Sequence, residues 1–403
     1  MLALIVGLAV LAVALAFRLP LWFVMFSTGF VMILLGSGFS ALIGAWAALA
    51  RLDYFGLFVA AYLVSVLVSL YRDTGMVDRL AQGLVSALRR PRLVVMFVPA
   101  VLGVLSIPGG ALMSAPVVDR VGEELGLGKA EKLFVNIWFR HLIFLVYPLS
   151  SVILVTSALA DVNIWSLITR NFPAFCVMAS VGYFLVLRGK RGGASRSAFL
   201  NAREDLLVSL LPLMLAVFLS LIFQLFLGWM LPPYFLVAGG VVVGIVTLAV
   251  SSKTNMRGVV GSALSKLSLE VFATTVGIVF LRVAFSVSGA SSAVAEVVRS
   301  AGLGGWVLLV VLPFVFSYLT GNSLSGVAIS YPILEGIIGI GISEAALLFD
   351  SAFLGYLSSP AHMCYVYTAQ YLKANFTSGY KYMVPATALV LLAAVLTYVF
   401  ARV

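Results

Sequence analysis

The stretch SIPGGALMSAPVV, residues 106–118, and its counterpart YLTGNSLSGVAISYPIL, residues 318–334, decide the fold of this chain. Both are short apolar stretches that Gly, Pro and small hydroxyl residues interrupt, and both lie among long apolar runs. Such irregular backbone cannot face lipid, because each unpaired N–H or C=O group there would cost several kcal/mol. Two breaks at matching places in two halves of a chain are typical of the binding site of a secondary transporter.

The composition of the 403 residues is that of a polytopic membrane protein. Hydrophobic residues make up 63% of the chain and charged residues 10%, whereas a soluble domain carries about 25% charged residues. The net charge of +10 could indicate nucleic-acid binding. Most Lys and Arg, however, lie in three short loops between apolar runs, as the positive-inside rule expects. We therefore expect membrane lipid, and no nucleic acid, around this protein.

Apolar runs of roughly the length that spans a bilayer fall into two sets. The first set lies near residues 2–17, 21–50, 54–71, 134–157 and 165–187. The second set lies near residues 206–228, 234–250, 269–286, 345–370 and 383–401. We predict an all-α polytopic membrane protein with about ten spans and two re-entrant hairpins, near 93–118 and 306–334. The run 21–50 is long enough to tilt, or to bend near Gly36 and Gly38.

The two halves align at a constant offset of 212 residues, which places Gly109 on Gly321. This internal symmetry predicts a repeat. The predicted organisation is a first repeat at 1–187, a basic linker at 188–205 and a second repeat at 206–403.

The basic loops 72–92, 188–205 and 251–268 set the topology, because all three should be cytoplasmic. The first hairpin must then enter and leave on the cytoplasmic side, and the second must open to the exterior. Each half has five spans, an odd number, so the halves have opposite orientations and form an inverted repeat. The expected location is the cytoplasmic (inner) membrane of a prokaryote.

The two hairpin tips are the expected binding site. Gly lets the chain reverse and lets a ligand approach the backbone closely, and the N-terminus of the half-helix after each tip suits an anion. Oxygens of Asn322 and Ser323 could instead hold Na⁺. The alternative is a helix kink packed against small neighbours. The residues expected to form the walls are Ser106, Gly109 and Gly110 in the first hairpin, and Thr320, Gly321, Asn322 and Ser323 in the second.

A proline interrupts the span after each hairpin. IWFRHLIFLVYPLSSVIL, residues 137–154, contains Pro148, and LGYLSSPAHMCYVYTAQYL, residues 354–372, contains Pro360. Proline breaks the helical hydrogen-bond ladder and frees carbonyl groups. The residues expected to complete the site from these breaks are Ser150, Ser151, Ser359 and His362.

Ionisable residues within spans are functional candidates, and each has an ordinary alternative. His362 could contact an anion or take a proton, or be neutral and bonded to a helix carbonyl. Arg140, beside His141, could bind an anion or snorkel to the cytoplasmic interface. Asp350 could join a cation or proton path, or mark a helix start at the interface. We interpret Arg282 as an interfacial anchor.

Both cysteines, Cys176 and Cys364, lie in apolar spans without a CxxC motif or a neighbouring histidine cluster. They are predicted to be buried thiols and not a disulfide or a metal site. The sequence has no HExxH and no GxxxxGK[ST] motif. We therefore expect neither an enzyme nor an ATP-driven pump, and no cofactor; a gradient, with Na⁺ or H⁺ as the coupling ion, would supply the energy.

Two inverted halves, each with a hairpin followed by a proline-broken span, resemble the ion transporter superfamily. It includes divalent-anion/sodium symporters and citrate and gluconate permeases. Residues 320–323, TGNS, look like a degenerate form of the Ser-Asn-Thr hairpin signature of the symporters, and SSPAHMC, residues 358–364, resembles an uncharacterised prokaryotic membrane family within the superfamily. The resemblance implies a homodimer with a scaffold domain and a transport domain that moves as an elevator.

Together these features predict a secondary active transporter for a small anionic, carboxylate-like solute, by symport with Na⁺ or H⁺. A cation/proton antiporter of the same architecture would need a carboxylate deep in the membrane, for which Asp350 is the candidate. A passive channel is the other alternative.

Overall fold

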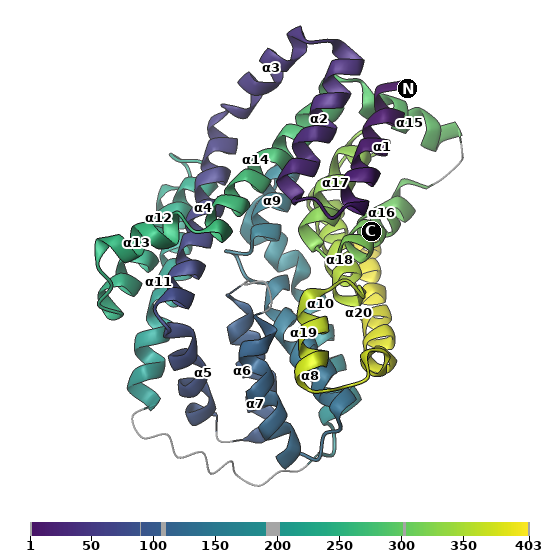
Figure 1. Ribbon diagram of the computed structural model, residues 1–403. Helices are drawn as coiled ribbons and strands as arrows, with labels where there is room; N and C mark the ends of the chain where they lie inside the picture. Colours follow the sequence, from purple (N-terminus) through teal and green to yellow (C-terminus); the bar gives the residue numbers. More distant parts are fainter. Residues whose placement is uncertain (1, 89, 106–109, 191–201, 301–303, 402–403) are drawn as a thin grey trace.

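The computed structural model describes residues 2–88, 90–105, 110–190, 202–300 and 304–401, and the regular structure in these ranges is helical (Figure 1). Six of the helices are long and apolar enough to cross a membrane. The predictions of an all-α chain and of an integral membrane protein are therefore confirmed.

The described helices of the first half include one broken pair, α8 and α9. A 3-10 turn, η1 (Ile143–Leu145), follows α8, and a π-helical turn, η2 (Tyr183–Leu187), ends α10. The α-helices are α1 (Leu2–Ala16), α2 (Leu21–Ser37), α3 (Ser40–Leu49), α4 (Leu52–Asp73), α5 (Met76–Ala87), α6 (Pro91–Gly103), α7 (Ala111–Glu124), α8 (Lys129–Leu142), α9 (Ser151–Ala160) and α10 (Ile164–Gly182).

The second half follows the same order of helices. Leu21 and Pro233 begin α2 and α12, and Ser151 and Met363 begin α9 and α19, so each pair starts 212 residues apart. A 3-10 turn, η3 (Phe376–Gly379), precedes the last helix. The α-helices are α11 (Ala202–Leu227), α12 (Pro233–Ser251), α13 (Met256–Ala263), α14 (Lys266–Val287), α15 (Ala290–Ser300), α16 (Gly305–Thr320), α17 (Ser323–Glu335), α18 (Ile342–Ser358), α19 (Met363–Tyr371) and α20 (Tyr380–Phe400).

Glycine and proline divide three of the predicted spans into separate helices. The run 21–50 forms α2 and α3, with Gly38 between them at a φ of 80°. Pro148 lies between η1 and α9, and Pro360 lies between α18 and α19. Proline has no N–H to continue the ladder, so the helix ends before it.

Two of the segments predicted as loops contain short helices. α5 lies within 72–92 and α13 within 251–268. Met76, Val77, Leu80 and Leu84 of α5 are buried, which is the spacing of an amphipathic helix. The predicted loops were wrong in this respect, because a helix with one apolar face carries too many charges to register as an apolar run.

The helices pack in two groups. The frame group consists of α1–α5 and α11–α15, and in it α4 packs against α12, α13 and α14. The hairpin group consists of α6–α10 and α16–α20, and in it α18 packs against α10, α16, α17 and α20. The groups meet where α9 contacts α4, α17 contacts α14 and α15, and α5 contacts α6. In Figure 1 the hairpin of α6 and α7 occupies the bottom of the molecule, and that of α16 and α17 its upper right part.

Candidate functional site

The second hairpin reverses between α16 and α17 through Gly321, whose φ of 64° is left-handed. The Asn322 side-chain oxygen accepts a hydrogen bond of 2.9 Å from the Leu324 N–H and so caps α17. The Thr320 hydroxyl donates to the Phe316 carbonyl at 2.7 Å. Ser323 begins α17 and is buried. The four residues predicted for this tip therefore form the turn itself and the start of the following helix.

This tip lies against the break between α18 and α19. A Cβ atom on Gly321 would lie 2.6 Å from the Ala361 carbonyl oxygen, so only glycine fits at this approach. The Ser359 hydroxyl donates to the Tyr318 carbonyl of α16 and accepts from the Ala361 N–H. The structure thus brings the turn at Gly321 against residues 359–361, which immediately precede His362 in the sequence.

The tip of the first hairpin includes Ser106 and Gly109, which lie outside the described residues; Gly110 directly precedes α7. At the end of α6, Gly103 lies so close to the Arg140 carbonyl that a Cβ atom would have no room. The Leu105 carbonyl accepts a hydrogen bond of 3.1 Å from Nη2 of Arg140. The first hairpin is therefore held against the end of α8.

Asn136 of α8 connects this helix to α7 and α19. Its side-chain nitrogen donates to the Ala111 carbonyl at 3.1 Å and to the Thr368 hydroxyl at 3.0 Å, and its oxygen accepts from the Ser114 hydroxyl at 2.7 Å. All three side chains are buried. This buried network fixes α7, α8 and α19 to one another.

Arg140 does not snorkel to the interface, because it lies in the last turn of α8 beside the helix break and is only 1% exposed. Nη1 has no hydrogen-bond partner in the described chain, and no described carboxylate forms an ion pair with the guanidinium. The C-terminal end of a helix favours a cation. A buried cation without a counter-charge is nevertheless costly, unless an anion joins it.

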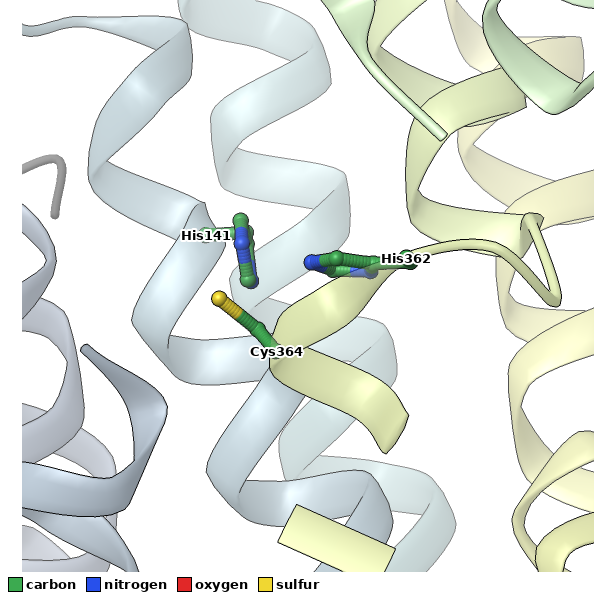
Figure 2. A group of neighbouring side chains, drawn as sticks. All are labelled: His141, His362 and Cys364. Carbon is green, nitrogen blue, oxygen red and sulfur yellow. The ribbon is translucent and has the colours of Figure 1, made fainter. Parts of the chain in front are cut away.

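The two histidines of the chain meet next to Arg140. The ring centroids of His141 and His362 are 4.7 Å apart, and His141 Nε2 lies 3.2 Å from the Tyr356 hydroxyl. Cys364 lies beside them, as Figure 2 shows. The His362 ring is fully buried near the Leu357 carbonyl, but neither ring nitrogen forms a well-aligned hydrogen bond in the described chain. Because the Leu357 carbonyl of α18 lies near the ring, a neutral histidine bonded to a helix carbonyl stays a prediction for His362.

The cysteines differ from the prediction. Cys364 is buried as expected, but it belongs to a cluster with both histidines that the sequence analysis missed. Cys176 is exposed on the outer surface of α10. The prediction that Cys176 is buried was wrong, because an apolar span can turn one face to lipid.

Ser150 and Ser151 begin α9, which packs against α4, α17 and α18. Ser150 is buried and Ser151 is half-buried. No side-chain hydrogen bond in the described ranges ties either serine to a hairpin tip or to the histidines.

Asp350 lies in the middle of α18 and is 3% exposed, so the interpretation as an interfacial helix start was wrong. It lines a small cavity together with Arg170, Ser343 and Thr397. Arg170 donates to the Ser343 hydroxyl at 2.8 Å, while Oδ1 of Asp350 has no partner among the described residues.

Arg282 is more than an interfacial anchor. It forms an ion pair of 2.7 Å with Glu335 at the end of α17 and donates to the Tyr54 hydroxyl at 2.8 Å. Its guanidinium lies 5.2 Å from the centre of the Tyr331 ring. Arg282 thus connects α14 and α4 of the frame group to the second hairpin.

The fold is similar to that of a solved transporter structure. The YdaH transporter of Alcanivorax borkumensis, described as having an unusual topology, matches with a TM-score of 0.64 and 16% sequence identity, over 90% of this chain and 87% of that chain. No curated protein matches the sequence. Residues 2–401 match the family described as "Protein of unknown function (DUF401)", and the chain therefore belongs to this family.

Proposed function

We propose that this protein is a secondary active transporter for a small anionic, carboxylate-like solute. The observation that carries the proposal is the Arg140 guanidinium, which is buried and unpaired by any described carboxylate. Leaving a charge buried without a partner destabilises a protein by roughly 3–5 kcal/mol. Such a group is retained where a ligand supplies the counter-charge.

The surroundings of Arg140 suit a solute of this kind. The end of the first hairpin contacts Arg140 through Leu105, and Gly321 of the second hairpin contacts the backbone next to His362. His362 offers ring nitrogens that have no well-aligned partner in the described chain. The N-terminus of α17 adds N–H groups and a positive dipole end. A carboxylate between the tips would meet donors from both halves.

The mechanism that we propose is alternating access of the elevator type, in a homodimer in the inner membrane of a prokaryote. The division into a frame group and a hairpin group supports it, since each group packs mainly within itself. Five spans and one hairpin in each half, in opposite orientations, would give the pseudo-symmetry that such transporters use. Loops 72–92, 188–205 and 251–268 would face the cytoplasm.

The coupling ion is Na⁺ or H⁺ in this proposal. Asn322 and Ser323 would supply oxygen ligands to Na⁺ beside the tip of the second hairpin. Asp350, buried and with an oxygen that no described group satisfies, favours a proton instead. The same carboxylate supports the second candidate function, a cation/proton antiporter.

A thermal-shift screen of carboxylates, oxyanions and amino acids, each with and without Na⁺, tests the proposal on the purified protein. A solute that raises Tm is then used for uptake into proteoliposomes. We expect saturable uptake that an imposed Na⁺ or H⁺ gradient accelerates, and its loss in His362→Ala. Uptake that does not saturate would indicate a channel. Cation efflux that depends on Asp350, without any anion effect, would indicate the antiporter.

Variants at Asn322 separate its structural role from its role in binding. Asn322→Ala removes the cap of α17, which should cost about 0.5–2 kcal/mol and lower Tm. Asn322→Asp keeps a capping oxygen but places a negative charge at the tip, so Tm should stay close to wild type while uptake of the anion falls. Asn322→Ser, which keeps both the cap and neutrality, is the control. Full uptake by Asn322→Asp would remove Asn322 from the anion site.

A further inference from the structure

His141, His362 and Cys364 form a buried group of nitrogen and sulfur donors where α8 meets α19 (Figure 2). One ligand atom from each residue lies within 4.8 Å of the other two. The residues are 1%, 0% and 6% exposed, in that order. In Figure 2 the thiol and the His362 ring both point toward His141. We propose that this group binds a soft monovalent metal ion, Cu⁺.

The His141 ring is already oriented as a metal ligand. Its Nδ1 lies 2.7 Å from the Ile137 carbonyl, which can only accept a hydrogen bond. Nδ1 therefore carries the proton, and Nε2 keeps a lone pair that accepts from the Tyr356 hydroxyl at 3.2 Å. A metal ion would take the place of that hydroxyl. A histidine that donates its other N–H to a backbone carbonyl is the usual arrangement around protein-bound metals.

His362 supplies an independent indication of a ligand. It is fully buried, and neither ring nitrogen forms a well-aligned hydrogen bond in the described ranges, although the Leu357 carbonyl lies near the ring. Buried polar atoms are almost always satisfied. His362 precedes α19 at its N-cap position, and Cys364 lies in the first turn of that helix. A short shift at this helix start would bring both donors closer to His141.

The donor types and the charge balance select the metal. Imidazole and thiolate suit soft or borderline ions and not Na⁺ or Mg²⁺. Arg140 interacts electrostatically with all three residues, and no carboxylate is among the groups that do so. Cu⁺ with the Cys364 thiolate adds no net charge beside Arg140. Zn²⁺ with the same ligands would add one positive charge to a buried site that already holds one.

The binding step is balanced by one proton. The Cys364 S–H bond breaks, the sulfur binds Cu⁺, and the proton passes to solvent; the histidines bind through neutral nitrogens, and copper is not oxidised. Metal–nitrogen and metal–sulfur bonds of about 2.0 and 2.3 Å place ligand atoms roughly 3.5–4 Å apart. A separation of up to 4.8 Å would therefore have to shorten by about 1 Å, which side-chain rotation and a small shift of the α19 start would supply.

Anaerobic competition between the purified protein and a chromophoric Cu⁺ chelator tests the proposal. The protein must be free of any affinity tag, since histidine tags bind copper. The Cys176→Ser variant is the matched control, because it removes the other, exposed thiol. We expect wild type and Cys176→Ser to hold one Cu⁺ per chain, and Cys364→Ser and His141→Ala to bind it at least about 10-fold more weakly. Zn²⁺, measured in the same way, should bind more weakly than Cu⁺.

Equal Cu⁺ affinity in Cys364→Ser and wild type would overturn the site, and tighter binding of Zn²⁺ would overturn the charge argument. X-ray absorption of Cu⁺-loaded Cys176→Ser does not depend on the folding of a ligand variant. One thiolate sulfur and two nitrogens around copper would support the proposal, and a spectrum without a thiolate sulfur would refute it. None of these readouts requires transport, so their failure leaves the proposed function untouched.

Discussion

Arg140→Met should abolish the response of the protein to its solute and at the same time raise the Tm of the solute-free protein. The substitution removes a buried charge that no described carboxylate neutralises and replaces it with an apolar side chain of similar length. Replacing buried ionic groups by apolar ones of similar volume is often neutral or stabilising. When one member of a buried charge pair between a protein and its ligand is truncated, the binding free energy weakens by about 2–5 kcal/mol. The affinity for the anion should therefore fall roughly 30-fold to several thousand-fold.

The measurement is a thermal-unfolding series of wild type and Arg140→Met, with and without the solute that the screen identifies. Arg51→Met is the control, since Arg51 is an exposed arginine whose side chain is 65% accessible; neither its Tm nor its solute response should change. A normal solute response in Arg140→Met would contradict the anion site. A large drop in solute-free Tm would mean that Arg140 holds the fold together through Leu105 and is not kept for a ligand.

Gly321→Ala should abolish solute uptake, whereas Gly75→Ala should leave it intact. The two glycines have nearly the same left-handed backbone, with φ values of 64° and 67°. A Cβ atom at Gly321 would press on Ala361, but one at Gly75 would meet nothing within 4 Å. Both variants carry a conformational cost of about 1–2 kcal/mol. Only Gly321→Ala also pushes the second hairpin away from the break before His362.

Uptake into proteoliposomes and thermal unfolding, measured on both variants, distinguish these effects. Both should show a similar moderate loss of Tm from backbone strain. Any further loss of Tm in Gly321→Ala measures the effect of the clash with Ala361. Normal uptake by Gly321→Ala would show that the contact between this hairpin and the break is not needed for transport. Loss of uptake in Gly75→Ala would mean that the strain alone is responsible.

The helices and their breaks could be predicted from local patterns. Apolar runs located the long helices, and Pro148 and Pro360 located the interruptions; α2 and α12, like α9 and α19, begin 212 residues apart, whereas the inverted repeat stays a prediction. Hydropathy did not predict where helices begin when their first turns are polar. α8 begins at Lys129, before the predicted span, where the Glu131 side chain accepts from the Gly128 N–H at 2.8 Å and caps the helix start. That early start moves Arg140 from the supposed interface to the helix break.

The clustering of the site could be predicted only in part. The contact of Gly321 with the break that contains Ser359 could be predicted. The second hairpin and the proline break after it were both expected to line one site. The meeting of His141 with His362 and Cys364 could not be predicted, because the offset of 212 matches the two broken spans but places Ser150, and not His141, on His362. Asp350 was misplaced for a simpler reason. Glu344 accepts from the Gly341 N–H at 3.1 Å and so starts α18 ahead of the apolar run.

The ion pair between Arg282 and Glu335 has a consequence for motion. It joins α14 to the end of α17, so these two charges would have to separate if the second hairpin moved along α14 as the proposed mechanism requires. Glu335 is 39% accessible at its side chain, and salt screens charges that water can reach. In the proposed elevator mechanism, high ionic strength should therefore weaken this ion pair and increase the rate of transport relative to low salt.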